Sequence, residues 1–131
     1  MKYDEFVGQV QHRAQLGSSG DAVGAIRATL QTLGERLFGG EAADLAAQLP
    51  REIGVYLELG GKKETFSIDE FFRRVTEREG VDRPDAVYHA RVVMEVIGEA
   101  VTKGEMDDVR AQLPDEYDPL FESGSSGRMK T

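Results

Sequence analysis

One stretch of this sequence occurs twice. Residues 21–58 and residues 85–122 align without a gap at a spacing of 64, and 15 of the 38 aligned positions are identical. The identical residues of the first copy are Asp21, Ala22, Val23, Arg27, Gly34, Glu35, Gly40, Glu41, Asp44, Ala47, Gln48, Leu49, Pro50, Glu52 and Glu58. Both copies contain the cluster Gln-Leu-Pro. The repeat predicts two related units, each with the same order of elements.

The residues before each copy show the spacing of an amphipathic helix. Residues 3–14 place apolar side chains on one helical face, and residues 67–79 repeat that spacing. The apolar positions are Tyr3, Phe6, Val7, Val10 and Ala14 in the first segment and Ile68, Phe71, Phe72 and Val75 in the second. Ser67 and Glu70 have the spacing of a capping box, which predicts a helix start at this point.

A longer helix is predicted at the start of each copy, over residues 21–37 and 85–101. Both segments carry an apolar stripe, and the second has the wider apolar face, so we expect it to be the most buried helix. Gly39 and Gly40, and Lys103 and Gly104, are predicted to end these helices. Short turns, residues 16–20 and 81–84, keep each long helix beside the helix that precedes it.

A third and shorter helix follows in each copy, and a proline ends it. Its first turn is predicted to be acidic in both copies, as suits the positive end of a helix dipole. A further irregular turn is expected after Pro50 and after Pro114, because Gly54 and Pro119 interrupt it. Residues 57–66 could form a small hairpin or plain coil, and both readings stay open.

These patterns predict an all-α fold of two pseudo-symmetric units, each with three main helices and a short turn after the proline. The first unit is residues 1–61 and the second is residues 62–122, followed by a disordered tail, residues 123–131. A unit of about 60 residues buries only a marginal core by itself. We therefore expect the two units to share one core and pack as a single domain.

The overall charge limits the choice of partners. The chain has 24 acidic and 16 basic residues, a formal net charge of -8. Such a field repels phosphate backbones and anionic lipid surfaces, which argues against nucleic acid and membranes as partners. The sequence has no cysteine, which excludes thiolate zinc ligands and a cysteine nucleophile and suits a reducing compartment. No apolar run approaches the roughly 20 residues of a membrane-spanning helix. We expect a cytoplasmic protein.

The duplicated polar residues are the candidates for a site. The sets Glu41, Asp44, Gln48, Glu52 and Glu105, Asp108, Gln112, Glu116 place acidic groups three residues apart on a helix, where they could hold a hard cation. Two carboxylates do not complete a calcium cage, however, and capping with dipole compensation explains the same pattern. We therefore predict no metal site and no cofactor.

The remaining charged residues favour ordinary structural roles. Arg27 and Arg91, also duplicated, could pair with Asp44 and Asp108 or bind a partner's carboxylate, and a solvated or internal salt bridge is the preferred interpretation. His12 and His89 stand at positions that do not correspond, so each is predicted to be a surface or satisfied histidine. The basic residues Arg73, Arg74 and Arg78 are expected to pair with glutamates on their own helix.

Several motifs together resemble a known family. The segments M-K-Y-D-E-F, T-L-x-x-L-G-E-R-L, G-G-E-A-A-D-L-A-A-Q-L-P, F-S-I-D-E-F and D-V-R-A-Q-L-P-x-E-Y are similar to those of domain of unknown function 2267, over essentially Met1 to Phe121. The resemblance implies a small helical protein of two related halves and carries over no activity, cofactor or catalytic residue.

Two functions of different classes are consistent with these features. The preferred one is a non-catalytic protein-protein interaction module with an unknown protein partner, as a monomer or homodimer. The alternative is a small-ligand-binding protein or enzyme with a pocket between the two halves. The candidate partner-binding residues are Arg27, Arg91, Asp44, Asp108, Gln48 and Gln112. No catalytic residue is predicted, because no nucleophile, metal set or cofactor motif stands out.

Overall fold

The computed structural model describes residues 1–122, so the predicted disordered tail, residues 123–131, lies outside the described residues. Within residues 1–122 the chain forms helices and no strand, which confirms the all-α prediction. The α-helices are α1 (Tyr3–Arg13), α2 (Ser19–Arg36), α3 (Glu41–Ala47), α4 (Arg51–Gly54), α5 (Ile68–Glu79), α6 (Arg83–Ala100) and α7 (Lys103–Ala111). Two 3-10 helices, η1 (Val55–Glu58) and η2 (Asp115–Phe121), follow α4 and α7. None of the helices in this part of the chain has the length and apolar character needed to cross a membrane.

The order of elements follows the spacing of the sequence repeat. Helices α2 and α6 begin at residues 19 and 83 and end at residues 36 and 100, so both boundaries differ by 64. Helices α3 and α7 follow them, and a short turn of helix follows each proline, as predicted. That the two halves have the same three-dimensional arrangement stays a prediction.

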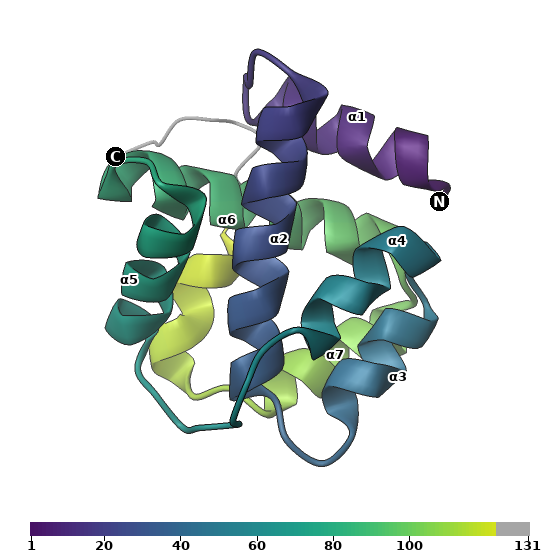
Figure 1. The fold of residues 1–131 in the computed structure, drawn as a ribbon. Helices are drawn as coiled ribbons and strands as arrows, with labels where there is room; N and C mark the ends of the chain where they lie inside the picture. The colour runs from purple at the N-terminus through teal and green to yellow at the C-terminus, as the bar shows by residue number, and fades with distance from the viewer. Residues whose placement is uncertain (123–131) are drawn as a thin grey trace.

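Helix α2 runs through the centre of the molecule, with the other helices around it (Figure 1). It packs against α1 and η1 of its own half and against α5 and α6 of the second half. Helix α6 likewise packs against α1 as well as α5. The first helix of each half therefore contacts the long helix of the other half.

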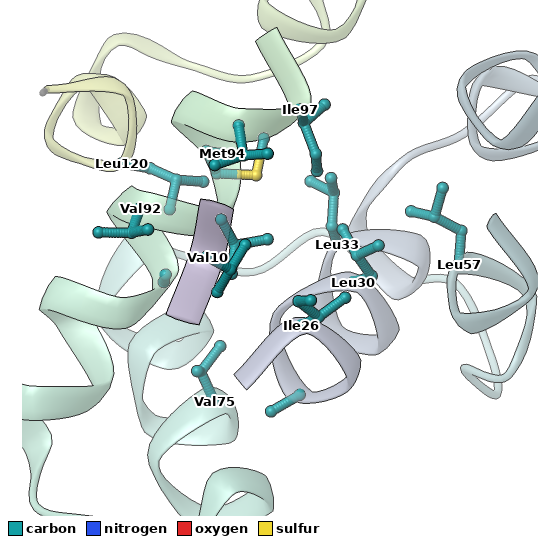
Figure 2. Close-up of a cluster of buried hydrophobic side chains, with 14 of the residues drawn as sticks. Val10, Ile26, Leu30, Leu33, Leu57, Val75, Val92, Met94, Ile97 and Leu120 are labelled. Carbon is teal, nitrogen blue, oxygen red and sulfur yellow. The ribbon is translucent and has the colours of Figure 1, made fainter. Parts of the chain in front are cut away.

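The core is a single cluster of buried apolar side chains that comes from both halves. Figure 2 shows Leu30 and Leu33 of α2 and Ile97 of α6 in the same cluster, with Leu57 of η1 to one side and Leu120 of η2 to the other. Each of these five side chains is at most 1% exposed. Residues 1–61 and 62–122 thus contribute to one common core, as expected.

The expectation that α6 would be the most buried helix is wrong. Eleven of the 18 residues of α2 are buried, against eight of the 18 residues of α6. The difference arises from polar side chains of α2, since Thr29, Thr32, Glu35 and Arg36 are all buried. Apolar patterning does not register these residues. Arg36 is held inside the molecule by hydrogen bonds from its Nε to the Phe66 carbonyl at 2.9 Å and the Tyr117 hydroxyl at 3.2 Å.

Hydroxyl side chains begin three of the helices. Ser18 accepts a hydrogen bond from the backbone N–H of Asp21 at 3.0 Å, and Ser67 and Thr102 accept the corresponding bonds three residues later at 3.1 Å. The role of Ser67 is thus confirmed, although the carboxylate of Glu70 binds arginines rather than closing the predicted box. The cap at Thr102 overturns another prediction.

Lys103 and Gly104 do not end α6. They are the first two residues of α7, because α6 ends at Ala100 and the cap formed by Thr102 starts a new helix at once. The first turn of α7 therefore contains Glu105, whereas Asp108 lies in the second turn. In the first half the prediction was correct, since Gly39 and Gly40 separate α2 from α3 with left-handed φ angles of 66° and 82°.

The connection between the halves is coil rather than a hairpin. Leu57 belongs to η1, and no strand is formed over residues 57–66. A backbone hydrogen bond joins this segment to α2: the N–H of Glu64 donates to the carbonyl of Glu35 at 2.8 Å. Helix α4 and η1 are short and irregular, as Gly54 predicted.

Candidate functional site

The duplicated acidic residues meet where α3 packs against α7. Glu41 is the first residue of α3, and Glu105 lies in the first turn of α7. One carboxylate oxygen from each of Glu41, Glu105 and Asp108 lies within 4.8 Å of the other two. Glu41 and Glu105 are only 9% exposed, whereas Asp108 and Asp44 are exposed. We call Glu41, Asp44, Glu105 and Asp108 the acidic cluster.

Two oxygens of the acidic cluster are buried without a partner. Oε2 of Glu41 and Oε2 of Glu105 are inaccessible and receive no hydrogen bond. Burial raises the pKa of Glu105 to about 7, and the close approach of the Glu41 carboxylate and the negative charges of Asp44 and Asp108 act in the same direction. Two carboxylates at this distance in a shielded place need a proton or a cation between them.

The duplicated glutamines join the halves beside the acidic cluster. The side chain of Gln112 accepts a hydrogen bond from the Phe38 N–H at 2.8 Å and donates one to the Phe38 carbonyl at 2.9 Å. The side chain of Gln48 accepts one from the Thr102 N–H at 2.9 Å. Gln48 and Gln112 are 64 residues apart, and so are Phe38 and Thr102. Both predicted partner-binding glutamines are therefore engaged within the molecule.

Sequence reasoning missed the ion pairs that join the halves. Arg78 of α5 binds Glu35 of α2 at 2.7 Å, and Arg13 of α1 binds Glu99 of α6 at 2.7 Å. Arg74 also reaches Glu35, at 3.0 Å. Glu35 and Glu99 are identical positions of the repeat, and Arg13 and Arg78 are 65 residues apart, the offset that relates the two first helices. These matching offsets between the two arginines and the two glutamates were the sequence signal that could have indicated the ion pairs.

The duplicated arginines do not pair with the duplicated aspartates, although Arg91 does form an internal salt bridge, with Glu122. Arg27 is exposed, and no salt bridge joins it to another residue in the range 1–122. Arg91 donates from Nε to the Pro119 carbonyl at 2.8 Å and lies 3.6 Å from the carboxylate of Glu122. Its place on α6 therefore directs it to the end of η2 and away from Asp108.

The two histidines have the ordinary roles that the sequence indicated. His12 is exposed. His89 is buried, and its Nδ1 lies 2.5 Å from Oε2 of Glu79. Glu70 binds both Arg73 and Arg74 on its own helix at 2.7 Å, as expected, whereas Arg78 pairs with Glu35 of α2 instead.

An open apolar groove lies between α3 and the α4–η1 segment. Its volume is about 470 Å³. It is lined by Ala43, Ala46, Ala47, Leu49, Arg51, Gly54, Val55 and Glu58. Val55 is 50% exposed, and Leu59, just beyond η1, is 45% exposed. We call this the α3–α4 groove.

The place in the second half that corresponds to the α3–α4 groove carries charges. Ala46 corresponds to Arg110 and Gly54 to Asp118. The guanidinium of Arg110 lies 4.0 Å from the carboxylate of Asp118 and 4.5 Å from the centre of the Phe121 ring. The first half is therefore apolar and open where the second half is covered by a charged side chain.

These features define a helical protein whose two halves are joined by ion pairs and by hydrogen bonds of glutamine side chains, with two buried carboxylates where α3 meets α7. A family model described as an uncharacterized conserved protein, DUF2267, matches residues 3–120. The chain belongs to this family, as the resemblance in its motifs indicated. No curated protein matches the chain.

Proposed function

We propose that this protein is a non-catalytic interaction module in which the α3–α4 groove binds a basic amphipathic segment of a partner protein. The observation that supports this proposal is the difference between the halves. In the α3–α4 groove of the first half, alanines and Val55 are open to solvent. At the corresponding place of the second half, the charged side chains of Arg110 and Asp118 lie instead. Exposed apolar surface of this kind is typical of binding sites.

The shape of the groove suits side chains of a protein segment rather than an enclosed ligand. Its lining offers alanine methyl groups and Val55. The charged residues Arg51 and Glu58 line the α4–η1 side. Small residues on α3 let a partner's helix approach closely, as in groove recognition of amphipathic helices. We therefore expect two or three apolar side chains of the partner to fill it.

The charge around the groove favours a basic partner. The elements α3, α4 and η1 expose three acidic residues, Asp44, Glu52 and Glu58, against one basic residue, Arg51. The chain as a whole has a net charge of -8. Opposite charge on the partner would speed association and select among partners. A second copy of the same acidic surface would be repelled.

The alternative of a small-ligand pocket or enzyme between the halves has less support. It requires a pocket lined by residues of both halves, such as Arg27 and Arg91. The α3–α4 groove is lined by the first half alone, as are two hollows beside α1. We also propose a cytoplasmic location, which the lack of cysteine favours.

The test compares two alanines that the repeat places at corresponding positions. Ala47 lines the groove, Ala111 lies at the same position of the second half, and both are exposed. A photoreactive amino acid would replace each in turn in the native cell. We expect a discrete cross-linked product at position 47, with a basic amphipathic segment of another protein attached, and none at position 111.

The affinity is then measured with a synthetic peptide of the cross-linked sequence. We expect Ala47→Arg to weaken binding at least roughly tenfold, because it places bulk and positive charge in the groove. Ala111→Arg should leave binding unchanged. Cross-linking to a second copy of this chain, equal products at both positions, or equal effects of the two substitutions would contradict the proposal.

A further inference from the structure

We propose that Glu41, Glu105 and Asp108 form a binding site for a hard divalent cation at the contact between α3 and α7. The site is independent of the α3–α4 groove. Its oxygens already converge within 4.8 Å of one another, although they come from two helices, and Glu41 and Glu105 are 64 residues apart in the sequence. The spacing within one helix could not indicate this arrangement, because the third ligand comes from the other half.

The buried oxygens point to a missing positive group. Oε2 of Glu41 and Oε2 of Glu105 are shielded from solvent and receive no hydrogen bond, in side chains that are 91% buried. A buried polar oxygen without a partner is strongly unfavourable, and two carboxylates together are more so. No lysine or arginine within residues 1–122 forms a salt bridge with either of them. A cation between them would satisfy both oxygens and their charge.

The donor atoms select the class of cation. All the converging groups are carboxylates, and no histidine or cysteine belongs to the group. Oxygen ligands suit Mg²⁺, Mn²⁺ and Ca²⁺, whereas zinc favours nitrogen and sulfur. Asp108 is exposed, so one side of the site is open to water. Mg²⁺ and Mn²⁺ keep several water ligands when a few carboxylates bind them, which fits this half-open geometry.

A bound cation would link the two halves, because its ligands come from both of them. Glu41 belongs to the first half and Glu105 to the second, and the hydrogen bonds of Gln48 and Gln112 lie in the same region. Because the ligands converge only in the folded chain, a cation would stabilise the folded state by mass action. Stability should therefore depend on cation concentration.

The first measurement is thermal unfolding of the purified full chain after treatment with a chelator. We expect millimolar Mg²⁺, Mn²⁺ or Ca²⁺ at pH 7.5 to raise the Tm by about 3–6 °C. Mn²⁺ should also broaden the amide NMR signals of α3 and α7 before those of α1 and α5. The broadening locates the ion without relying on any activity.

Three substitutions make the test specific. Glu105→Gln and Asp108→Asn should each abolish the Tm increase and the selective broadening. Asp107→Asn is the matched control, because Asp107 is an exposed acid of the same helix that pairs with Lys103 outside the site. It should retain both responses. Asp108 is exposed, so its variant stays informative if the buried substitution prevents folding.

A different outcome would overturn the proposal. In that case the wild-type protein shows no cation-dependent Tm and no selective broadening, and Glu105→Gln raises the Tm at pH 8. Such a result would mean that a shared proton holds the two glutamates together. An equal loss of response in Asp107→Asn would also contradict the site, because it would reduce the effect to general screening of negative charge.

Discussion

At the scale of single residues, Gly34 and Gly98 occupy corresponding places in α2 and α6 but meet different surroundings. A Cβ atom at Gly34 would lie 2.0 Å from the carbonyl oxygen of Leu57, so η1 crosses α2 at a place where only glycine fits. A Cβ atom at Gly98 would have Met106 Cγ as its nearest neighbour at 3.9 Å, an ordinary contact. The same residue therefore serves packing in one half and not in the other.

This difference gives a paired prediction. We expect Gly34→Ala to lower the free energy of unfolding by about 2–4 kcal/mol, because η1 must move away from α2. Gly98→Ala should raise it by about 0.5–1 kcal/mol, because alanine is the better helix former. Urea unfolding followed by circular dichroism measures both. If the two substitutions had equal effects, the close approach of Leu57 to α2 would be wrong.

At the scale of the elements, ion pairs fix how α2 lies against α5. The carboxylate of Glu35 is 7% exposed and binds both Arg78 and Arg74. Burial by itself would raise the pKa of Glu35, but the hydrogen bonds from Arg78 and Arg74 outweigh it and hold the pKa below its usual value of 4.5. Folding therefore favours the ionised form of this group.

The lowered pKa predicts how stability changes with pH. The contribution of Glu35 is present above pH 4.5 and is lost as the pH falls through the folded-state value. We expect Glu35→Gln to lower the free energy of unfolding by about 1–3 kcal/mol at pH 7 and to flatten its decrease between pH 5 and 3. Glu77→Gln is the control, because the Glu77 side chain is 73% exposed. An unchanged acid slope in Glu35→Gln would count against this interpretation.

The elements also show which features a sequence can reveal. The helices, their order and the cap at Ser67 depend on neighbouring residues, so periodicity and capping patterns predicted them. The error at Lys103 and Gly104 has the same basis, since glycine is a common stop signal for a helix, whereas here Thr102 caps a new one. Local pattern therefore determined most of the secondary structure.

Local sequence pattern could not predict the acidic cluster or the ion pairs between the halves. Glu41 meets Glu105, and Arg13 meets Glu99, only because of how the halves pack. The repeat marked the glutamates as identical positions but gave no information on what they face. The burial of Arg36 depended on Phe66 and Tyr117, far along the chain, and no periodicity indicates such a contact.

At the scale of the whole molecule, the two halves are interlocked through their first helices. Helix α1 packs against α6, and α5 packs against α2, around the common core. Neither half keeps its long helix covered without the other. A chain of about 60 residues also has little core of its own.

We therefore expect residues 1–61 not to fold alone. The isolated fragment should show weak helicity by circular dichroism and no cooperative thermal unfolding, whereas the full chain unfolds in one transition. Mixing it with a second fragment, residues 62–131, should restore cooperative unfolding. An isolated first fragment that melts cooperatively as a monomer would contradict the interlocked arrangement.

The contact between α1 and α6 also has a consequence for folding during synthesis. Arg13 and Glu99 are 86 residues apart in sequence. Ribosomes add roughly 5–20 residues per second, so α1 leaves the ribosome several seconds before its counterpart on α6. During that interval the apolar side chains Phe6 and Val10, which are fully buried in the finished protein, lack part of their cover. We therefore expect the newly made first half to be open to chaperone binding until the second half emerges.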